Sequence, residues 1–293
     1  MKLAGGVLGI ALLMAAGDAN AWCQETTCND PDAGACPRND NGCKTTGAGR
    51  AWQKLPIVFR FTTTHPATIL REDARAAIRA AFYRWSDTLC GADQQRTSLR
   101  FSEGEELATD KPLVAGSHGT EPFGIYFRDG DWPYAGKADS TLAQTNVDFI
   151  KTKGWYTYAD IEINTGSSKF TTTDDGVGND LQAVITHEVG HYIGLDHSKA
   201  PDSIMVPAYC QDLDVRCGKG VVAARRLAND DIDAVCTLYP PGRANDTTTA
   251  AAEQAGTQGG CVASATRGRA DASIPLLGLT VALGALVRKR LRR

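Results

Sequence analysis

The sequence lacks the excess of basic residues that a nucleic-acid-binding surface carries. Its 31 Lys and Arg residues are outnumbered by 34 Asp and Glu residues, which gives a net charge of −3. Five of the positive charges lie in the last six residues, 288–293, and without these five the net charge is −8. A nucleic-acid-binding protein presents a basic face. We therefore expect no nucleic-acid partner.

Apolar runs long enough to cross a membrane are also missing. The apolar segments at the two ends, residues 3–16 and 274–287, contain 14 residues each, whereas a membrane-spanning helix needs about 20. The first segment follows Lys2 and is followed by small residues, which is the order of a secretory signal peptide. We predict that residues 1–21 are a signal peptide, cleaved before Trp22. The protein is then secreted or displayed on the extracellular face of the cell.

Cysteine is abundant, with nine residues, and this agrees with export because disulfides persist outside the reducing cytosol. Four cysteines lie between Cys23 and Cys43, in a segment with almost no apolar residues that cannot bury a core of its own. A zinc knuckle is the competing interpretation, but the spacings of four, seven and six intervening residues match no common paired pattern. We therefore predict a disulfide-linked N-terminal segment, residues 22–50.

The remaining cysteines allow further pairs. Cys210 and Cys217 are close enough in sequence to close a small loop, and we expect a disulfide between them. Cys90 and Cys236 each lie on or next to a helix expected to pack nearby, which makes them the next candidate pair. Cys261 is then the odd cysteine, because eight others can pair.

Residues 51–240 have the pattern of one mixed α and β domain. Apolar residues at steps of four, three and four from Ile78 to Leu89 predict a helix over about 67–89, buried along one face. A terminal helix follows Asn229, which we expect to be its N-cap. Strands and long helices in this order predict an α+β fold, arranged as an α/β sandwich. The predicted strands cover residues 57–61, 99–101, 123–127 and, half-buried, 160–164; residues 241–260, rich in Ala, Thr, Gly and Gln, form a flexible linker.

Histidine is scarce, and three of the five histidines fall in the segment HEVGHYIGLDH at residues 187–197. Positions four apart share a helix face, so His187 and His191 point at a common site, with Glu188 beside it. Gly194 can end the helix in a left-handed conformation, and the following turn delivers His197. Three imidazoles around zinc leave its fourth position open to water, which is typical of a catalytic site. We predict His187, His191 and His197 as metal ligands and Glu188 as general base.

The extended motif matches the signature of the metzincin zinc peptidases, and within them it resembles the matrixins, the matrix-metalloproteinase-like branch. Ser198 follows the third histidine, as in matrixins. Met205 lies in a segment similar to the Met-turn, a tight turn beneath the zinc ligands. Pro207 and Tyr209 resemble the Met-x-Pro-x-Tyr run that forms a wall of the matrixin specificity pocket. Pro207 also occupies the position at which other metzincin branches place a zinc-binding tyrosine.

This resemblance implies a metzincin-type catalytic domain over residues 51–240, with a mixed twisted sheet, a long active-site helix and a Met-turn. The implied activity is zinc-dependent hydrolysis of extracellular proteins or peptides, through a water activated by one catalytic Zn2+ and by Glu188. We expect a monomer. An adhesion or binding module that keeps the metal site with little turnover is the alternative, although such a site usually loses its general base first.

Animal matrixins also carry a structural zinc bound by three further histidines. Only His65 and His118 remain here, and we predict that this second zinc is absent. Calcium (Ca2+) stays an open question. The resemblance places Asp160 and Glu162 where matrixins have an acidic pair at a calcium site, and three more acids crowd a loop. These three are Asp174, Asp175 and Asp180.

The C-terminal segment, residues 261–293, combines Cys261, an apolar run and an Arg-rich end. This order resembles the myxobacterial-type C-terminal sorting tail, in which the tail is removed and the protein stays at the cell surface through its cysteine. The alternatives are an ordinary tail anchor or a disordered end. We expect membrane contact only through this tail.

Overall fold

A computed structural model describes residues 21–28, 36–108, 123–130, 132–134, 140–174, 178–207 and 225–243 of the 293-residue chain. Several predictions concern residues outside these ranges. They include the signal peptide, the linker beyond residue 243, Tyr209, the Cys210–Cys217 pair and Cys261.

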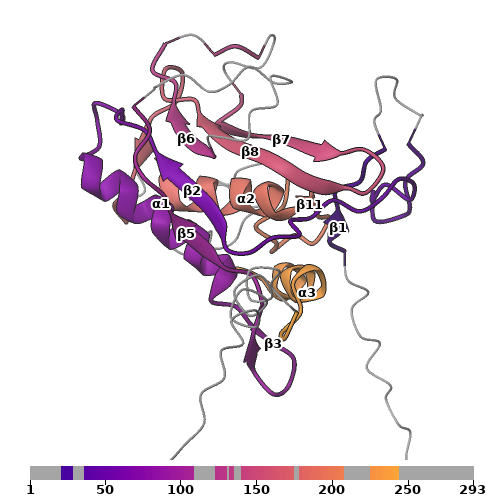
Figure 1. The fold of residues 1–293 in the computed structure, drawn as a ribbon. Coiled ribbons are helices and arrows are strands. Elements are labelled where there is room, and N and C mark those ends of the chain that lie inside the picture. The colour runs from indigo at the N-terminus through magenta and orange to yellow at the C-terminus, as the bar shows by residue number, and fades with distance from the viewer. Residues whose placement is uncertain are drawn as a thin grey trace, which may run out of the picture.

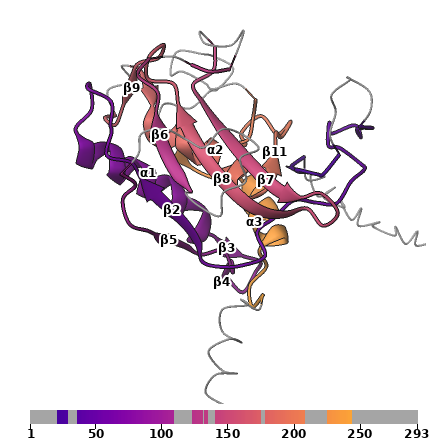
Figure 2. The same ribbon diagram turned by 45° about the horizontal axis from the view of Figure 1, so that its top comes forward.

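A five-stranded mixed sheet forms the centre of the fold, with the strand order β5-β2-β6-β8-β7 (Figure 2). β7 is antiparallel to β8, whereas the other neighbouring pairs are parallel. The order leaves β7 at one edge, paired only with β8 among the described residues. The strands are β2 (Ile57–Phe61), β5 (Phe101–Glu103), β6 (Gly124–Phe127), β7 (Ala143–Ile150) and β8 (Trp155–Ile163).

Two helices, α1 (Arg71–Ser86) and α2 (Leu181–Ile193), pack together against one face of this sheet (Figure 1). Phe82 of α1 is fully buried and stacks on Phe59 of β2, with the ring centroids 4.2 Å apart. Trp85, one turn further along α1, is also fully buried and donates its indole N–H to the Thr186 carbonyl of α2. The predicted α+β fold class is confirmed.

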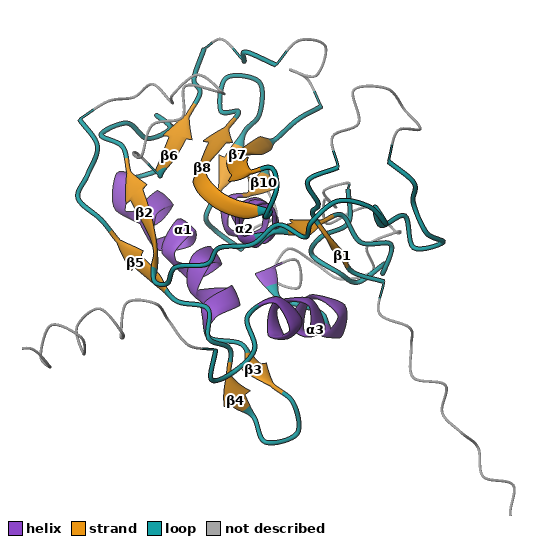
Figure 3. Ribbon diagram, turned by 45° about the vertical axis from the view of Figure 1, so that its right-hand side comes forward, coloured by secondary structure: helices purple, strands orange, loops and turns teal. Residues whose placement is uncertain are grey.

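The prediction for the first helix was too long at both ends. α1 begins at Arg71, after an extended Leu70, and it ends at Ser86. The chain turns at Asp87 and enters β3 (Leu89–Cys90), where Leu89 is exposed instead of buried. Cys90 is disulfide-bonded to Cys236 in α3 (Asn229–Leu238), and this bridge fixes the turn after α1 beside the last helix (Figure 3). The expected Cys90–Cys236 pair is therefore confirmed.

The predictions about the cap of the last helix and the burial of one strand need correction. Asp180 caps α2, because its carboxylate accepts the Ala183 N–H at 2.7 Å. Asn229, in contrast, is the first residue of α3 and not its N-cap, and the Asp231 carboxylate accepts the N–H of the preceding Ala228. The strand around residue 160 is not half-buried, because Asp160 and Glu162 are buried on the face opposite the helices, with polar partners of their own.

Short strand pairs complete the described structure. β1 (Cys23–Gln24) pairs with β11 (Leu195–Asp196), β3 pairs with β4 (Gln95–Arg96), and β9 (Phe170–Thr171) pairs with β10 (Asn179–Asp180).

Disulfides Cys23–Cys43 and Cys28–Cys36 confirm the predicted cross-linking of the N-terminal segment. In the described part of the chain, no helix combines the length and apolarity that a membrane span requires.

Candidate active site

Helix α2 carries two of the three clustered histidines, and both of its ends are defined by specific contacts. The Asp180 cap lies at its start, where Arg225 also contacts the carboxylate. Gly194 follows the last turn with φ of 111°, in the left-handed region that glycine adopts without strain. A Cβ atom at this position would lie 2.4 Å from the Arg50 carbonyl oxygen, so a larger residue is excluded sterically as well. The chain therefore reverses at Gly194 and returns towards α2.

This reversal brings His197 to the pair on the helix. One ligand nitrogen from each of His187, His191 and His197 lies within 4.8 Å of the others. The Nε2 atoms of His187 and His191 are 3.1 Å apart, and the His197 ring centroid lies 4.9 Å from that of His191. The first two side chains are partly buried, whereas His197 is exposed. The site is thus open to solvent on the His197 side.

The hydrogen bonds of the two helical histidines show that the cluster fits a metal ion. Nδ1 of His187 lies 2.7 Å from the Ile204 carbonyl, and Nδ1 of His191 lies 2.8 Å from the Leu195 carbonyl. A carbonyl can only accept, so each Nδ1 carries a proton, and in the neutral tautomer each ring turns a bare Nε2 lone pair inward. Two lone pairs facing each other at 3.1 Å repel unless a cation lies between them. Tetrahedral zinc would hold its nitrogen ligands about 3.3 Å apart, close to this spacing.

Desolvation favours the metal-binding form of His187 and His197. Burial lowers the pKa of His187, and the neighbouring His191 lowers it further. The pKa of His197 is also lowered, mainly because its ring is partly desolvated although the residue is exposed, and then by His187. Neutral imidazole is the metal-binding form, so the environment favours ligation at neutral pH.

Glu188 is buried, and its side chain is held from the neighbouring edge strand. Oγ1 of Thr145 in β7 lies 2.7 Å from the Glu188 carboxylate and 2.9 Å from the Glu188 backbone carbonyl. The prediction from sequence did not include Thr145. The polar, irregular pattern of β7 gave no strand signal, and the contact joins residues 43 positions apart.

Met205 lies beneath the histidine pair and is almost completely buried. A Cβ atom placed on Gly190 would lie 2.2 Å from the Met205 sulfur, so the methionine packs directly on the helix between His187 and His191. The backbone N–H of Ser198 donates to the Met205 carbonyl at 2.9 Å, which joins this turn to the chain just after His197. Pro207 is exposed at the end of the described segment.

Helix α3 supports the same turn through Asp231. This buried carboxylate accepts the Ser203 hydroxyl and the Ile204 N–H, the latter at 2.9 Å. Burial raises the pKa of Asp231 to about 6. The Ile204 carbonyl in turn accepts Nδ1–H of His187, so a chain of contacts runs from α3 to one of the three histidines.

The acids considered for calcium have protein partners in the structure. Asp160 and Glu162 both accept from the Asn146 side chain, and Glu162 also accepts from Arg128 and Tyr134. The other candidates are similarly engaged or lie elsewhere: Asp174 pairs with Arg225, Asp180 caps α2, and Asp175 is outside the described residues. Of the histidines outside the cluster, His65 is exposed and His118 is outside the described residues.

Comparison with known proteins assigns the class of this domain. Residues 51–240 match the family model of the matrixins, and the chain belongs to this family. Membership identifies a zinc metalloendopeptidase at the level of the family. The three disulfides among the described residues fit an extracellular protein.

Individual relatives are similar at a moderate level. Matrix metalloproteinase-C of Caenorhabditis elegans is 26% identical over 203 residues, which is 68% of this chain and 30% of that protein. Metalloendoproteinase 2-MMP of Arabidopsis thaliana is 29% identical over 188 residues, 62% of this chain and 40% of its own length. Stromelysin-1 of Rattus norvegicus is 28% identical over 214 residues, 73% of this chain and 37% of that protein. The chain thus matches less than half the length of these relatives.

Proposed function

We propose that this protein is a zinc-dependent endopeptidase in which His187, His191 and His197 bind the catalytic ion and Glu188 is the general base. The observation that carries the proposal is the inward-facing Nε2 pair of His187 and His191, 3.1 Å apart, with the carboxylate of Glu188 on the adjacent helix position. An adhesion module that had lost catalysis would have no use for this buried carboxylate.

A bound zinc ion would lower the pKa of a coordinated water to about 7 and polarise the carbonyl of the scissile bond. Glu188 accepts the proton of the attacking water and then donates it to the leaving amine. The Thr145 hydroxyl keeps the Glu188 carboxylate in one orientation during both transfers. Exposure of His197 leaves the approach to the site open for a polypeptide.

The edge strand β7 supports a protein substrate. Its outer edge pairs with no other strand among the described residues, and its residue Thr145 contacts the proposed general base. An extended polypeptide can add to such an edge through main-chain hydrogen bonds. The substrate would then run beside Glu188, with its scissile bond near the histidines. Pro207 and Tyr209 belong to the proposed wall of the specificity pocket, which favours an apolar residue after the cleaved bond.

We extend the proposal to both ends of the chain. Residues 1–21 direct secretion and are removed. The sorting tail, residues 262–293, is removed as well, and Cys261 is modified so that the enzyme acts at the extracellular cell surface. The disulfides support an oxidising compartment.

A comparison of Glu188→Ala with His191→Ala tests the proposed roles. Glu188→Ala should retain zinc and lose nearly all peptide hydrolysis, because Glu188 contributes no metal ligand. His191→Ala should lose both. The measurements are zinc content by elemental analysis and hydrolysis of denatured casein. Substantial hydrolysis by Glu188→Ala would refute the role of general base, and a wild-type protein that binds zinc without turnover would favour the binding module.

A further inference from the structure

The N-terminal segment is hydrogen-bonded to the turn that carries His197. We call residues 21–28 and 36–50 the N-terminal strap. Its strand β1 pairs antiparallel with β11, so that Cys23 faces Asp196 and Gln24 faces Leu195. The Glu25 N–H also donates to the Gly194 carbonyl at 2.8 Å. The strap therefore contacts the backbone at each of the three residues before His197.

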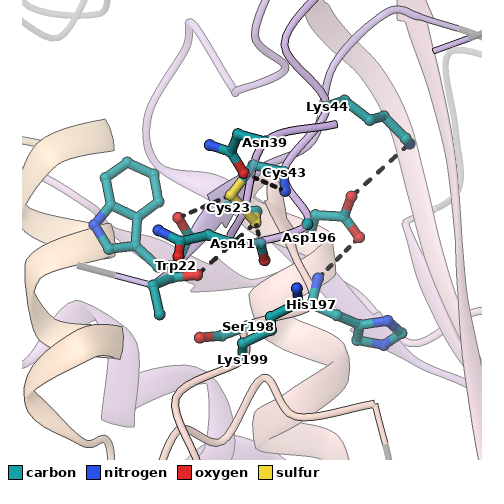
Figure 4. Close-up of a disulfide and its surroundings, with 12 residues drawn as sticks. Trp22, Cys23, Asn39, Asn41, Cys43, Lys44, Asp196, His197, Ser198 and Lys199 are labelled. Carbon is teal, nitrogen blue, oxygen red and sulfur yellow. Dashed lines mark hydrogen bonds and ion pairs between the residues drawn. A yellow bond between two sulfur atoms is a disulfide. The ribbon is translucent and has the colours of Figure 1, made fainter. Parts of the chain in front are cut away.

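The strap contacts the residues on both sides of His197, through two charged side chains before it and a backbone carbonyl after it. The Asp196 carboxylate lies 3.7 Å from the Arg38 guanidinium. It also lies 3.9 Å from the Lys44 ammonium (Figure 4). Its other oxygen accepts the N–H of His197 at 2.8 Å. After His197, the Lys199 ammonium donates to the Asp40 carbonyl at 2.7 Å. The ligand thus lies between two contacts to the same short stretch of the strap.

The disulfide Cys23–Cys43 links strand β1 to the charged turn, and these two parts of the strap make the contacts described above. Cys23 belongs to the strand that pairs with β11, and Cys43 lies next to Lys44, in the turn that also supplies Arg38 and Asp40. The Cys43 N–H donates to the Asn39 side chain, which closes this turn. Trp22 is the strap side chain that packs against the hydrophobic core, and Cys23 itself is buried. Without the cross-link, the strand and the charged turn would be ordered separately, at a greater loss of conformational entropy.

We propose that the N-terminal strap, locked by Cys23–Cys43, is a positioning element for the third metal ligand, His197. His187 and His191 are fixed by α2 itself, but His197 lies beyond the Gly194 reversal and is exposed. The strap supplies the support for this turn that the helix cannot give. The inference rests on the proposed zinc site, and it assigns the N-terminal strap to the catalytic unit and not to a removable inhibitor.

The test compares two disulfide variants of the full chain. Cys23→Ser/Cys43→Ser opens the lock, and Cys28→Ser/Cys36→Ser is the matched control, because it removes a disulfide from the same segment without touching the turn near Asp196. Zinc affinity is measured by competition with a chromophoric chelator. Outer contacts that orient metal ligands typically change metal affinity about 10–100-fold. We expect a loss in this range for the first variant and a change of less than about twofold for the control.

A third comparison shows whether the effect passes through His197. In a His197→Ala background, opening Cys23–Cys43 should cause no further loss of zinc affinity, since the ligand that the strap positions is gone. Equal additional losses with and without His197 would show a general destabilisation and overturn the inference. Asp196→Asn tests the same turn without a cysteine change: it keeps an oxygen for the His197 N–H, removes the charge facing Arg38 and Lys44, and should weaken zinc binding severalfold.

The outcomes separate the two proposals. A wild-type chain that binds no zinc refutes the proposed function. A wild-type chain that binds zinc, together with unchanged affinity in both Cys23→Ser/Cys43→Ser and Asp196→Asn, refutes only the role of the strap. Increased hydrolysis after the lock is opened would identify the strap as an inhibitor and likewise contradict the inference.

Discussion

The Thr145 hydroxyl is the single described side chain that donates to the Glu188 carboxylate. A hydrogen bond to a charged group contributes about 1.5–3 kcal/mol. If this bond mainly orients the general base, Thr145→Val should lower kcat at least tenfold, with little change in KM or zinc content. Thr145→Ser retains the hydroxyl and should restore most of kcat. Equal losses of kcat in the Val and Ser variants would mean that the methyl group and its packing matter, and not the hydrogen bond.

At the same scale, the sequence predicts the histidine cluster better than it predicts the contacts that support the cluster. His187, Glu188 and His191 share one helix, and helical spacing is a local property that the sequence displays directly. Gly194 gives the place of the reversal that leads to His197. Thr145 reaches Glu188 only because β7 pairs with β8 beside α2, and no local pattern encodes that contact.

At the scale of elements, the contact between α2 and the turn that carries Met205 is tight enough to exclude one methyl group. Alanine normally stabilises a helix by up to about 1 kcal/mol relative to glycine. At position 190 its Cβ would lie 2.2 Å from the Met205 sulfur and 3.2 Å from the buried Trp85 ring. Overpacking of this kind costs about 1–3 kcal/mol. We therefore expect Gly190→Ala to lower the free energy of unfolding by about 1 kcal/mol or more in urea denaturation.

A double-mutant cycle checks the cause. In a Met205→Ala background the clash is gone, so Gly190→Ala should become neutral or stabilising. If it destabilises equally in both backgrounds, the contact between Gly190 and Met205 does not explain the preference for glycine.

The sequence predicted a strand in the region of β8, but the prediction that its polar face lies in solvent was wrong. The alternation of Ile161 and Ile163 with polar residues predicted a polar face in solvent. That face is instead covered by side chains from the segment around Arg128 and Tyr134 and from β7. The order of strands in the sheet and the path of that covering segment depend on long-range contacts, and the sequence pattern of one strand contains neither.

Burial of Asp160 gives this polar cluster a measurable pH dependence. Desolvation raises the pKa of Asp160 to about 6, from an ordinary value of 3.8. Between these values the folded state retains a proton that the unfolded state has lost, so the free energy of unfolding falls as pH rises through this window and is level above it. Asp160→Asn cannot titrate and should show a smaller fall. Urea denaturation of the metal-free protein between pH 4 and pH 7 measures the difference, and parallel profiles for the two proteins would contradict the assignment.

For the whole molecule, the distribution of histidines limits the metal content. The His187, His191 and His197 group is the one cluster of three or more metal-binding side chains in the described part of the chain. We predict one zinc ion per chain. Elemental analysis of the purified protein checks this number and measures calcium in the same sample. Two zinc ions per chain would require a second site and would refute the predicted loss of the structural one.

The overall architecture combines predictable and unpredictable parts. Fold class and the cross-linking of the N-terminal segment follow from composition, periodicity and cysteine spacing. The attachment of that segment to β11 does not, because Cys23 and Asp196 are brought together only by the completed fold. The N-terminal strap therefore looked like a separate segment in the sequence, whereas the structure joins it to the turn bearing His197.

The central claim, zinc-dependent peptide hydrolysis, is tested most directly by one assay on the purified chain. Hydrolysis of denatured casein is measured before treatment with a chelator, after the zinc has been removed, and after one equivalent of zinc per chain has been restored. The account predicts activity, loss of activity and recovery, in that order. Hydrolysis that persists in the demonstrably zinc-free protein would contradict it.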